Sequence, residues 1–158
     1  MTDQEVTVRR ARPEDVPGIV RSSSRLFAED GGPRDPSLNT DWPRLHGAEA
    51  FTAALRDPAR LLLAALCDGE VVGHLSGSMS GPSAMRPVRS ATLMALYVWP
   101  EHRRGRVGAR LVEAFVEWGR REGAVHAEVT ASAANGDGIR FYERERLRPQ
   151  ALTLRLNL

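Results

Sequence analysis

The sequence contains no lysine: all 22 basic residues are arginine, and 20 acidic residues leave a formal net charge of only +2. Aromatic side chains, which stack on bases in many nucleic-acid binders, make up just 6% of the chain. Four arginines do gather between positions 103 and 110. Because the net charge is low and aromatic residues are few, this cluster alone does not indicate nucleic-acid binding. An arginine-based nucleic-acid binder is therefore the least favoured function, and we expect no nucleic-acid partner.

Cysteine and long apolar segments are also scarce. Cys67 is the only cysteine, so it can form no internal disulfide, and its apolar surroundings predict a small buried side chain rather than a reactive thiol. The longest apolar run, Leu61 to Cys67, is far shorter than the roughly 20 residues that span a bilayer. The first ten residues lack the apolar stretch of a signal peptide. We therefore expect a cytoplasmic protein without a membrane partner.

The length of 158 residues predicts one domain, residues 1–158, with a hydrophobic core of its own. Patterns of period two and short apolar runs predict strands, and helical spacing of apolar residues predicts helices. Strands are expected at 5–11, 61–67, 70–79, 91–99, 125–130 and 151–156. Helices are expected at 15–28, 49–56, from about 105 up to Gly123, and at 135–145. The expected order is β-α-α-β-β-β-α-β-α-β, with exposed loops at 31–44 and 81–89.

Two connections between these elements predict a mixed sheet. Asp68-Gly69 suits the tight turn of an antiparallel hairpin, because both of its residues tolerate positive φ. The strand at 91–99, the following helix and the strand at 125–130 form a crossover, which favours parallel pairing of the two strands. The chain is therefore predicted to be an α/β protein.

Residues of the types used in binding and catalysis are concentrated from Leu96 to Gly108, where the apolar strand leads into an arginine-rich helix start. A helix N-terminus presents free backbone N–H groups and partial positive charge, glycines permit close approach, and arginines add charge-assisted hydrogen bonds. These properties suit a diphosphate. An ordinary solvated helix start next to a tight turn would produce the same residues, so both interpretations stay open at this level.

The same segment resembles the coenzyme-A signature of the GNAT superfamily of N-acetyltransferases. That signature has an apolar-Val-x-Pro strand end, then Arg or Gln, two free positions, Gly, one free position, and Gly or Ala. Here Val98 to Arg103 match and Gly108 fills the last place. Arg106 stands where the middle glycine belongs, and Gly105 precedes it by one position. The departure predicts a phosphate loop that is shifted or that binds less tightly.

Other parts of the chain are similar to the same family. Residues 135–142 resemble its Asn-x-x-Ala-x-x-Phe-Tyr helix, with Gly138 in place of Ala. Residues 68–73 look like the hairpin before the coenzyme strand, and residues 8–15 look like the family's opening. The resemblance thus covers most of the chain. Several short motifs in the right order are together more specific than any one of them.

The resemblance implies a single GNAT-like domain with a central, strongly twisted mixed sheet flanked by helices. It implies acetyl-CoA as cosubstrate and transfer of the acetyl group to a primary amine by direct attack in a ternary complex. The strand around Leu96 to Val98 would bulge away from its neighbour and offer N–H donors, and Tyr142 would act as general acid toward the coenzyme thiolate. The implied coenzyme-binding residues are Leu96, Tyr97, Val98, Arg103, Arg104, Gly105, Arg106, Val107, Gly108, Ala109 and Asn135.

The general base is not identified by the resemblance. Many relatives carry a glutamate on the coenzyme strand, whereas this chain has Thr92 and Met94 there. Possible substitutes are Glu101, His102, His74 and Glu128, or a chain of water molecules, although a solvated or structural role is the more usual one for each of these side chains. His126 and Glu128 share one face of a strand and are expected to pair. No set of His, Cys, Asp and Glu has convincing metal-ligand spacing, so no metal is predicted.

The acceptor and the assembly also remain open. The acceptor is expected to be an amine of a small molecule, a peptide or a protein, and the protein is expected to be a monomer or homodimer. Four acidic residues of the first loop could attract a cationic amine: Glu29, Asp30, Asp35 and Asp41. The alternative function is an acyl-CoA-binding sensor or partner module without catalysis, motivated by Arg106, Gly138 and the missing strand glutamate.

Overall fold

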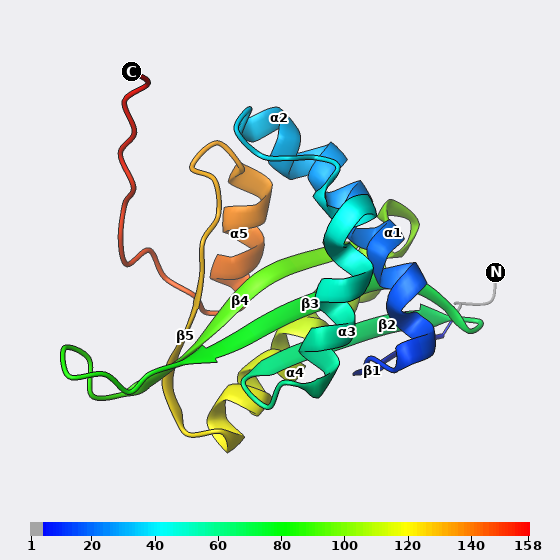
Figure 1. Ribbon diagram of the computed structural model, residues 1–158, viewed down its shortest axis with the longest axis horizontal. Helices are drawn as coiled ribbons and strands as arrows, with labels where there is room; N and C mark the ends of the chain where they lie inside the picture. Colours follow the sequence, from blue (N-terminus) through cyan, green and yellow to red (C-terminus); the bar gives the residue numbers. More distant parts are fainter. Residues whose placement is uncertain (1–4) are drawn as a thin grey trace.

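A computed structural model describes residues 5–158 and shows one five-stranded sheet in the order β1-β2-β3-β4-β5 (Figure 1). The first four strands pair antiparallel, and β5 pairs parallel to β4, as the crossover predicted. The sheet is therefore mixed, and β1 and β5 are its two edge strands. The bounds are β1 (Val6–Arg10), β2 (Arg60–Cys67), β3 (Glu70–Ser80), β4 (Arg89–Val98) and β5 (Ala124–Val129).

Helices cover both faces of the sheet (Figure 1). The alternation of side chains along β2 divides the core: Leu61 and Leu63 pack on the face of α4, and Leu62 packs on the face of α1 and α3. Because both faces are buried, β2 is a continuous apolar run rather than an alternating one. The helices are α1 (Val16–Leu26), α3 (Ala48–Arg56), α4 (Val107–Arg121) and α5 (Gly136–Arg144).

The predicted turn residues occupy the conformations expected of them. Asp68 and Gly69 both have positive φ, at 50° and 80°, and close the β2–β3 hairpin. Gly123 has φ of 82° directly after α4, and β5 begins at the next residue. Local chemistry was thus enough to predict these two chain reversals.

Two predicted segments differ from the structure. The loop expected at 31–44 is helical at both ends, because α1 continues through a π-helical turn (Phe27–Gly31) into α2 (Gly32–Arg34), and another such turn (Pro43–Gly47) leads into α3. The strand expected at 151–156 is wrong: these residues form no strand and are exposed. Their alternation has the period of a strand, but the structure places no pairing partner beside them.

The pairing of β4 positions the site. Residues 90–93 of β4 pair with both β3 and β5, whereas Ala95 to Val98 pair only with β3. Met94 is an extra residue in the ladder with β3, since Ser76 pairs with Ala95 and the next residue of β3 pairs with Leu93. The bulge therefore lies at Met94 rather than at Leu96 to Val98. Beyond it, β4 and β5 separate.

Candidate active site

A cavity of about 740 Å³ opens where β4 and β5 separate. Its walls come from the open half of β4, the start of α4, the residues after β5, helix α5, and the end of α1 with α2. The volume lies within the range of about 300 to 1,000 Å³ that is usual for small-molecule and cofactor sites. A smaller hollow of about 300 Å³ between β1, β2 and α4 contains none of the predicted site residues.

Most of the predicted site residues lie together around this cavity. Gly105 and Val107 are the exceptions: neither lines it, and the Val107 side chain is buried in the core on the α4 face. Their role in coenzyme binding, like that of the others, stays a prediction. The predicted residues that line the cavity are Leu96, Tyr97, Val98, Arg103, Arg104, Arg106, Gly108, Ala109, Asn135 and Tyr142.

The turn before α4 explains the departure at Arg106. Arg106 has φ of 59° and ψ of 20°, a left-handed conformation that glycine adopts without steric cost. The left-handed position thus falls on Arg106, the residue where the family signature has glycine. Gly105 has no such constraint, because a Cβ added there would meet no atom within 4 Å.

Gly108, in the first turn of α4, allows the helix to approach α5 closely. A Cβ at this position would lie 3.2 Å from the ring of Phe141, a tight contact. Phe141 and Tyr142 pack against each other with their ring centroids 5.1 Å apart. The N-terminus of α4, with its free backbone N–H groups, is therefore held beside the α5 side chains at the cavity.

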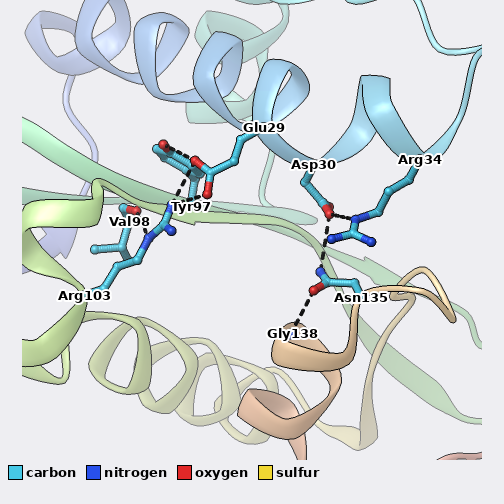
Figure 2. A network of polar contacts seen from close by, with 8 residues as sticks. All are labelled: Glu29, Asp30, Arg34, Tyr97, Val98, Arg103, Asn135 and Gly138. Carbon is cyan, nitrogen blue, oxygen red and sulfur yellow. Dashed lines mark hydrogen bonds and ion pairs between the residues drawn. The ribbon is translucent and has the colours of Figure 1, made fainter.

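Glu29, in the turn after α1, is bonded to the end of β4 and to the turn that precedes α4 (Figure 2). Its carboxylate accepts hydrogen bonds from the Tyr97 hydroxyl at 2.7 Å and from the Arg103 guanidinium at 2.8 Å. Arg103 also donates to the Val98 carbonyl at 2.8 Å. Partial burial raises the pKa of Glu29, but the hydrogen bonds from Tyr97 and Arg103 outweigh it, and the net pKa lies below its usual value. Glu29 is thus an anchored carboxylate.

Asp30, the next residue, reaches the opposite wall of the cavity (Figure 2). It forms an ion pair with Arg34 and lies 3.4 Å from the Asn135 side-chain nitrogen. The Asn135 carboxamide oxygen accepts a hydrogen bond from the Gly138 N–H at 3.0 Å and so caps α5. A Cβ at Gly138 would lie 2.5 Å from the same side chain, so glycine at this position lets Asn135 fold over the helix start.

Tyr142 has the properties of a proton donor. Burial, followed by the negative charge of Asp30, raises the pKa of its phenol to about 12. The hydroxyl therefore stays protonated throughout the physiological pH range. Its side chain lines the cavity beside the open half of β4, so a proton or hydrogen bond is available there.

The predicted substitutes for the base are not brought to the cavity. His74 is completely buried with its Nδ1 2.6 Å from the Ser22 hydroxyl, and burial lowers its pKa to about 4, so it is a hydrogen-bonded structural group rather than a base at the cavity. Glu101 and His102 do not line the cavity. His126 and Glu128 do pair, at 3.7 Å, but lie outside it. Within residues 5–158, no cluster of His, Cys, Asp and Glu suits a metal ion.

The acidic residues of the first loop divide between two places. Glu29 and Asp30 line the cavity, whereas Asp35 pairs with Arg155 and Asp41 pairs with Arg44. Sequence reasoning missed several lining residues: Leu26, Arg34, Leu93, Val129, Thr130, Ala131, Asp137, Arg144 and Glu145. Among these residues, only Arg34 had a signal in the sequence. It follows Asp30 by four residues, which is the spacing of an ion pair on one face of a helix.

Comparison with solved structures shows that other proteins share this fold. The chain is 19% identical to a variant of the protein BH1408 from Bacillus halodurans, covering 96% of this chain and 99% of that one, with a TM-score of 0.86. It is 17% identical to an acetyltransferase of Trypanosoma brucei, covering 98% and 100%, with a TM-score of 0.74. Comparison with curated proteins gives no match.

A third structure links the fold to the coenzyme. It is the aminoglycoside N-acetyltransferase AAC(6')-Iy in complex with CoA, which is 14% identical, covers 99% of this chain and 97% of its own, and has a TM-score of 0.78. At the level of sequence, the profile described as the acetyltransferase (GNAT) family matches residues 25–146. This match includes the β4–α4 junction and Tyr142. The chain therefore belongs to the GNAT family of acetyltransferases.

Proposed function

We propose that this protein transfers an acetyl group from acetyl-CoA to a primary amine of a small molecule or peptide, with both substrates bound together. The observation that carries the proposal is the cavity at the separation of β4 and β5, which brings the start of α4, the open half of β4 and Tyr142 together. Each of these suits one part of a thioester substrate. Acetyl-CoA would supply the activated acetyl group.

The chain's own residues fit a diphosphate at the start of α4. Arg104 and Arg106 line the cavity beside the free N–H groups of the helix, and in residues 5–158 Arg104 takes part in no salt bridge. Arg106 pairs only with Glu113, in an exposed contact, whereas the guanidinium of Arg103 is engaged by both Glu29 and the Val98 carbonyl. We therefore assign phosphate contacts to Arg104 and Arg106, and to Arg103 the positioning of the strand end.

Residues 95–98 of β4 and Tyr142 would serve the reacting end. Backbone groups of β4 that face away from β3 have no strand partner here, so N–H donors can be aimed at the charge that develops on the thioester oxygen. The amine nitrogen forms the new bond to the acetyl carbon while the carbon–sulfur bond breaks. Tyr142 donates its proton to the departing sulfur, the attacking nitrogen releases one proton to water, and the Tyr142 phenolate takes up a proton from water.

Asp30 favours a cationic acceptor. It lies on the cavity wall across from Asn135, and its charge is felt at Tyr142, so an amine held by Asp30 would be close to the reacting end. Asp30→Asn should raise KM for the amine more than it lowers kcat. Asp41→Asn, which removes an exposed charge paired with Arg44 outside the cavity, is the matched control. Equal effects of the two substitutions on KM would refute this role.

The catalytic proposal is tested by removing one hydroxyl. Tyr142→Phe should lower kcat about 100-fold, the lower end of the range for general acid catalysis, with the Kd for acetyl-CoA nearly unchanged. The matched control is Tyr97→Phe, since the chain has only two tyrosines. Loss of the Tyr97 hydroxyl removes a hydrogen bond to Glu29 and should lower kcat less than Tyr142→Phe does. An unchanged rate for Tyr142→Phe would remove Tyr142 from the mechanism.

Calorimetry with acetyl-CoA tests the binding site separately from the chemistry. Gly108→Trp should abolish binding because its bulk would enter the cavity at the start of α4. Glu113→Trp adds the same bulk to an exposed position of α4 outside the cavity and should bind normally. Coenzyme binding without thioester consumption on any amine of a broad panel would instead favour the sensor function. Strongly salt-dependent binding to DNA or RNA would favour a nucleic-acid binder.

A further inference from the structure

Arg60, the first residue of β2, is a partly buried arginine whose side-chain hydrogen bonds all go to neutral groups. Its Nε donates to the Gly77 carbonyl at 3.2 Å, and one Nη donates to the Ser76 hydroxyl at 3.1 Å. In the described part of the chain, Arg60 takes part in no salt bridge. The nearest acid before it, Asp57, accepts a hydrogen bond from the Ala59 N–H at 2.9 Å. A guanidinium carries five N–H donors in a fork that matches carboxylate and phosphate groups, so donors remain for such a group.

A row of polar side chains crosses the sheet from Arg60. Arg60 lies two residues before Leu62 and therefore on the α1 and α3 face of the sheet. Directly paired residues of neighbouring strands share a face, and the row that begins at Arg60 continues through Ser78, Thr92 and Glu128. Glu128, at the far end, accepts a hydrogen bond from the Ser90 hydroxyl at 3.0 Å. Ser78 and Thr92 are neutral and only partly buried, so the part of the row next to Arg60 is polar and accessible.

The guanidinium of Arg60 lies beside the bulge of β4 at Met94. Its two acceptors, Ser76 and Gly77, are the β3 residues whose strand partners stand on either side of Met94. Residues 93–95 line the cavity, and Met94 is 55% exposed. Arg60 itself does not line the cavity. Because neighbouring strands are about 4.8 Å apart, its guanidinium lies roughly that far beyond this wall.

We infer that the acceptor amine also carries an anionic group, a carboxylate or a phosphate-like group, and that Arg60 binds this group. The inference rests on the proposed function, because the amine end has to reach the open half of β4 beside Tyr142. From there the molecule would cross the bulge at Met94 to the free donors of Arg60. Asp30, on the cavity wall across from Asn135, would attract the amine, so each charge of the acceptor meets an opposite charge.

Partial burial distinguishes Arg60 from the exposed arginines of the surface. Its Nη donates to Ser76, which is only 4% exposed, so an anion bound there is partly removed from water. Charges that are partly removed from water interact more strongly than charges in full contact with it. Arg120, on α4, is exposed and also takes part in no salt bridge in the described residues. It therefore serves as a matched control for the loss of one unpaired positive charge.

Calorimetry with N-acetylated amines, which are products of the proposed reaction, tests recognition without turnover. N-acetylglycine, N-acetyl-β-alanine and N-acetyl-γ-aminobutyrate are each compared with their carboxamides, and N-acetyl-aminoethylphosphonate with N-acetylethanolamine, with and without CoA. At least one anion should bind about 10-fold more tightly than its neutral counterpart, the size expected for hydrogen bonds to a charged group. A preference among the carboxylates indicates amino acids, and one confined to the phosphonate indicates amines that carry phosphate. Equal Kd values in every pair overturn the inference.

Two substitutions remove the free charge in different ways. Arg60→Gln deletes the guanidinium, whereas Thr92→Glu keeps it and adds a carboxylate in the same row, two strands away, that competes for it. Both should abolish the preference for the anion, and Arg120→Gln should retain it. A preference that survives Arg60→Gln overturns the inference, as does one that Arg120→Gln abolishes as well. Thr92→Glu decides in the same way where Arg60→Gln is too unstable to be measured.

Thioester consumption distinguishes the failure of this inference from the failure of the proposed function. With acetyl-CoA, kcat/KM should be higher for the preferred anionic amine than for its neutral counterpart, and Arg60→Gln should bring the two values together. Turnover that is equal for anionic and neutral amines overturns the inference and leaves acetyl transfer in place. A preference for the anion in calorimetry, without turnover on any amine, refutes acetyl transfer and supports recognition of the anion by Arg60.

Discussion

Between Ser90 and Leu93, β4 has a strand on each side, whereas between Ala95 and Val98 it has only β3. In the first half the backbone groups are used in the sheet. In the second half those that face away from β3 are open to the cavity. The bulge at Met94 stands between the two halves. One continuous strand is thus structural at its beginning and available for binding at its end.

This difference between the two halves of β4 shows which feature of the structure creates the binding surface. Nothing in the composition of Ala95 to Val98 marks these residues as a binding surface, since the stretch is largely apolar and has no charged side chain. The second half is distinguished by the loss of its neighbour, because β5 ends its pairing at Val129 opposite Leu93. The candidate site is therefore a property of the separation of two strands, and substitutions should affect the two halves differently.

The largest expected contrast is between leucines of the two halves. Leu93 is 3% exposed in the core, so Leu93→Ala should lower the free energy of unfolding by about 2 to 5 kcal/mol. Leu96 is only partly buried and lines the cavity, so Leu96→Ala should cost less stability and should weaken acetyl-CoA binding. Denaturant unfolding and calorimetry measure the two effects. Equal losses of stability would mean that the halves do not differ in packing.

The next largest effect concerns His74, the residue of β3 that is the strand partner of Tyr97 in the second half of β4. Burial lowers its pKa from 6.5 to about 4, so the unfolded chain takes up this proton at higher pH than the folded one. Stability is complete above about pH 6.5 and should fall by about 3 kcal/mol as the pH drops to about 4. His74→Gln removes this dependence. Unfolding measured against pH should therefore be less steep for His74→Gln, and identical slopes would contradict a buried neutral histidine.

A smaller effect is expected at Glu29, which holds the end of the open half through Tyr97 and Arg103. Glu29→Gln should lower the free energy of unfolding by no more than about 1 kcal/mol, because the Arg103 and Glu29 side chains are 43% and 46% exposed. Glu113→Gln breaks the more exposed pair with Arg106 and should change stability less. Equal losses in the free energy of unfolding for the two variants, measured by urea denaturation, would show that Glu29 does not anchor the strand end.

The smallest expected effect is at Arg106, in the turn that follows the open half. Arg106→Gly removes the strain of a left-handed conformation but increases the freedom of the unfolded chain. The free energy of unfolding should therefore rise by about 0.5 kcal/mol. Arg104→Gly, at a residue without positive φ, should instead lower the free energy of unfolding by about 0.5 to 1 kcal/mol. Thermal unfolding of both variants compares them. A loss at Arg106 equal to that at Arg104 would refute strain in this turn.

Local patterns predicted most of the sheet and part of the site. Asp68-Gly69 and Gly123 predicted two chain reversals because positive φ is a property of single residues and their neighbours. The segment 96–109 and Tyr142 were predicted to share a site, and the structure brings most of these residues to one cavity. His74 has the structural role that is usual for a lone histidine, but the sequence does not reveal that α1 and α3 cover this face of β3 completely.

The amino-acid sequence by itself determined the order of elements up to α5, the mixed sheet and the junction that resembles the family signature, because these depend on short-range periodicity and turn chemistry. Only the tertiary structure decided where β4 loses β5, that Glu29 and Asp30 reach opposite walls of one cavity, and that residues 151–158 stay unpaired. The physical reason is that strand pairing and burial depend on which neighbours the whole chain supplies. A segment with the alternation of a strand becomes one only where a partner edge lies beside it.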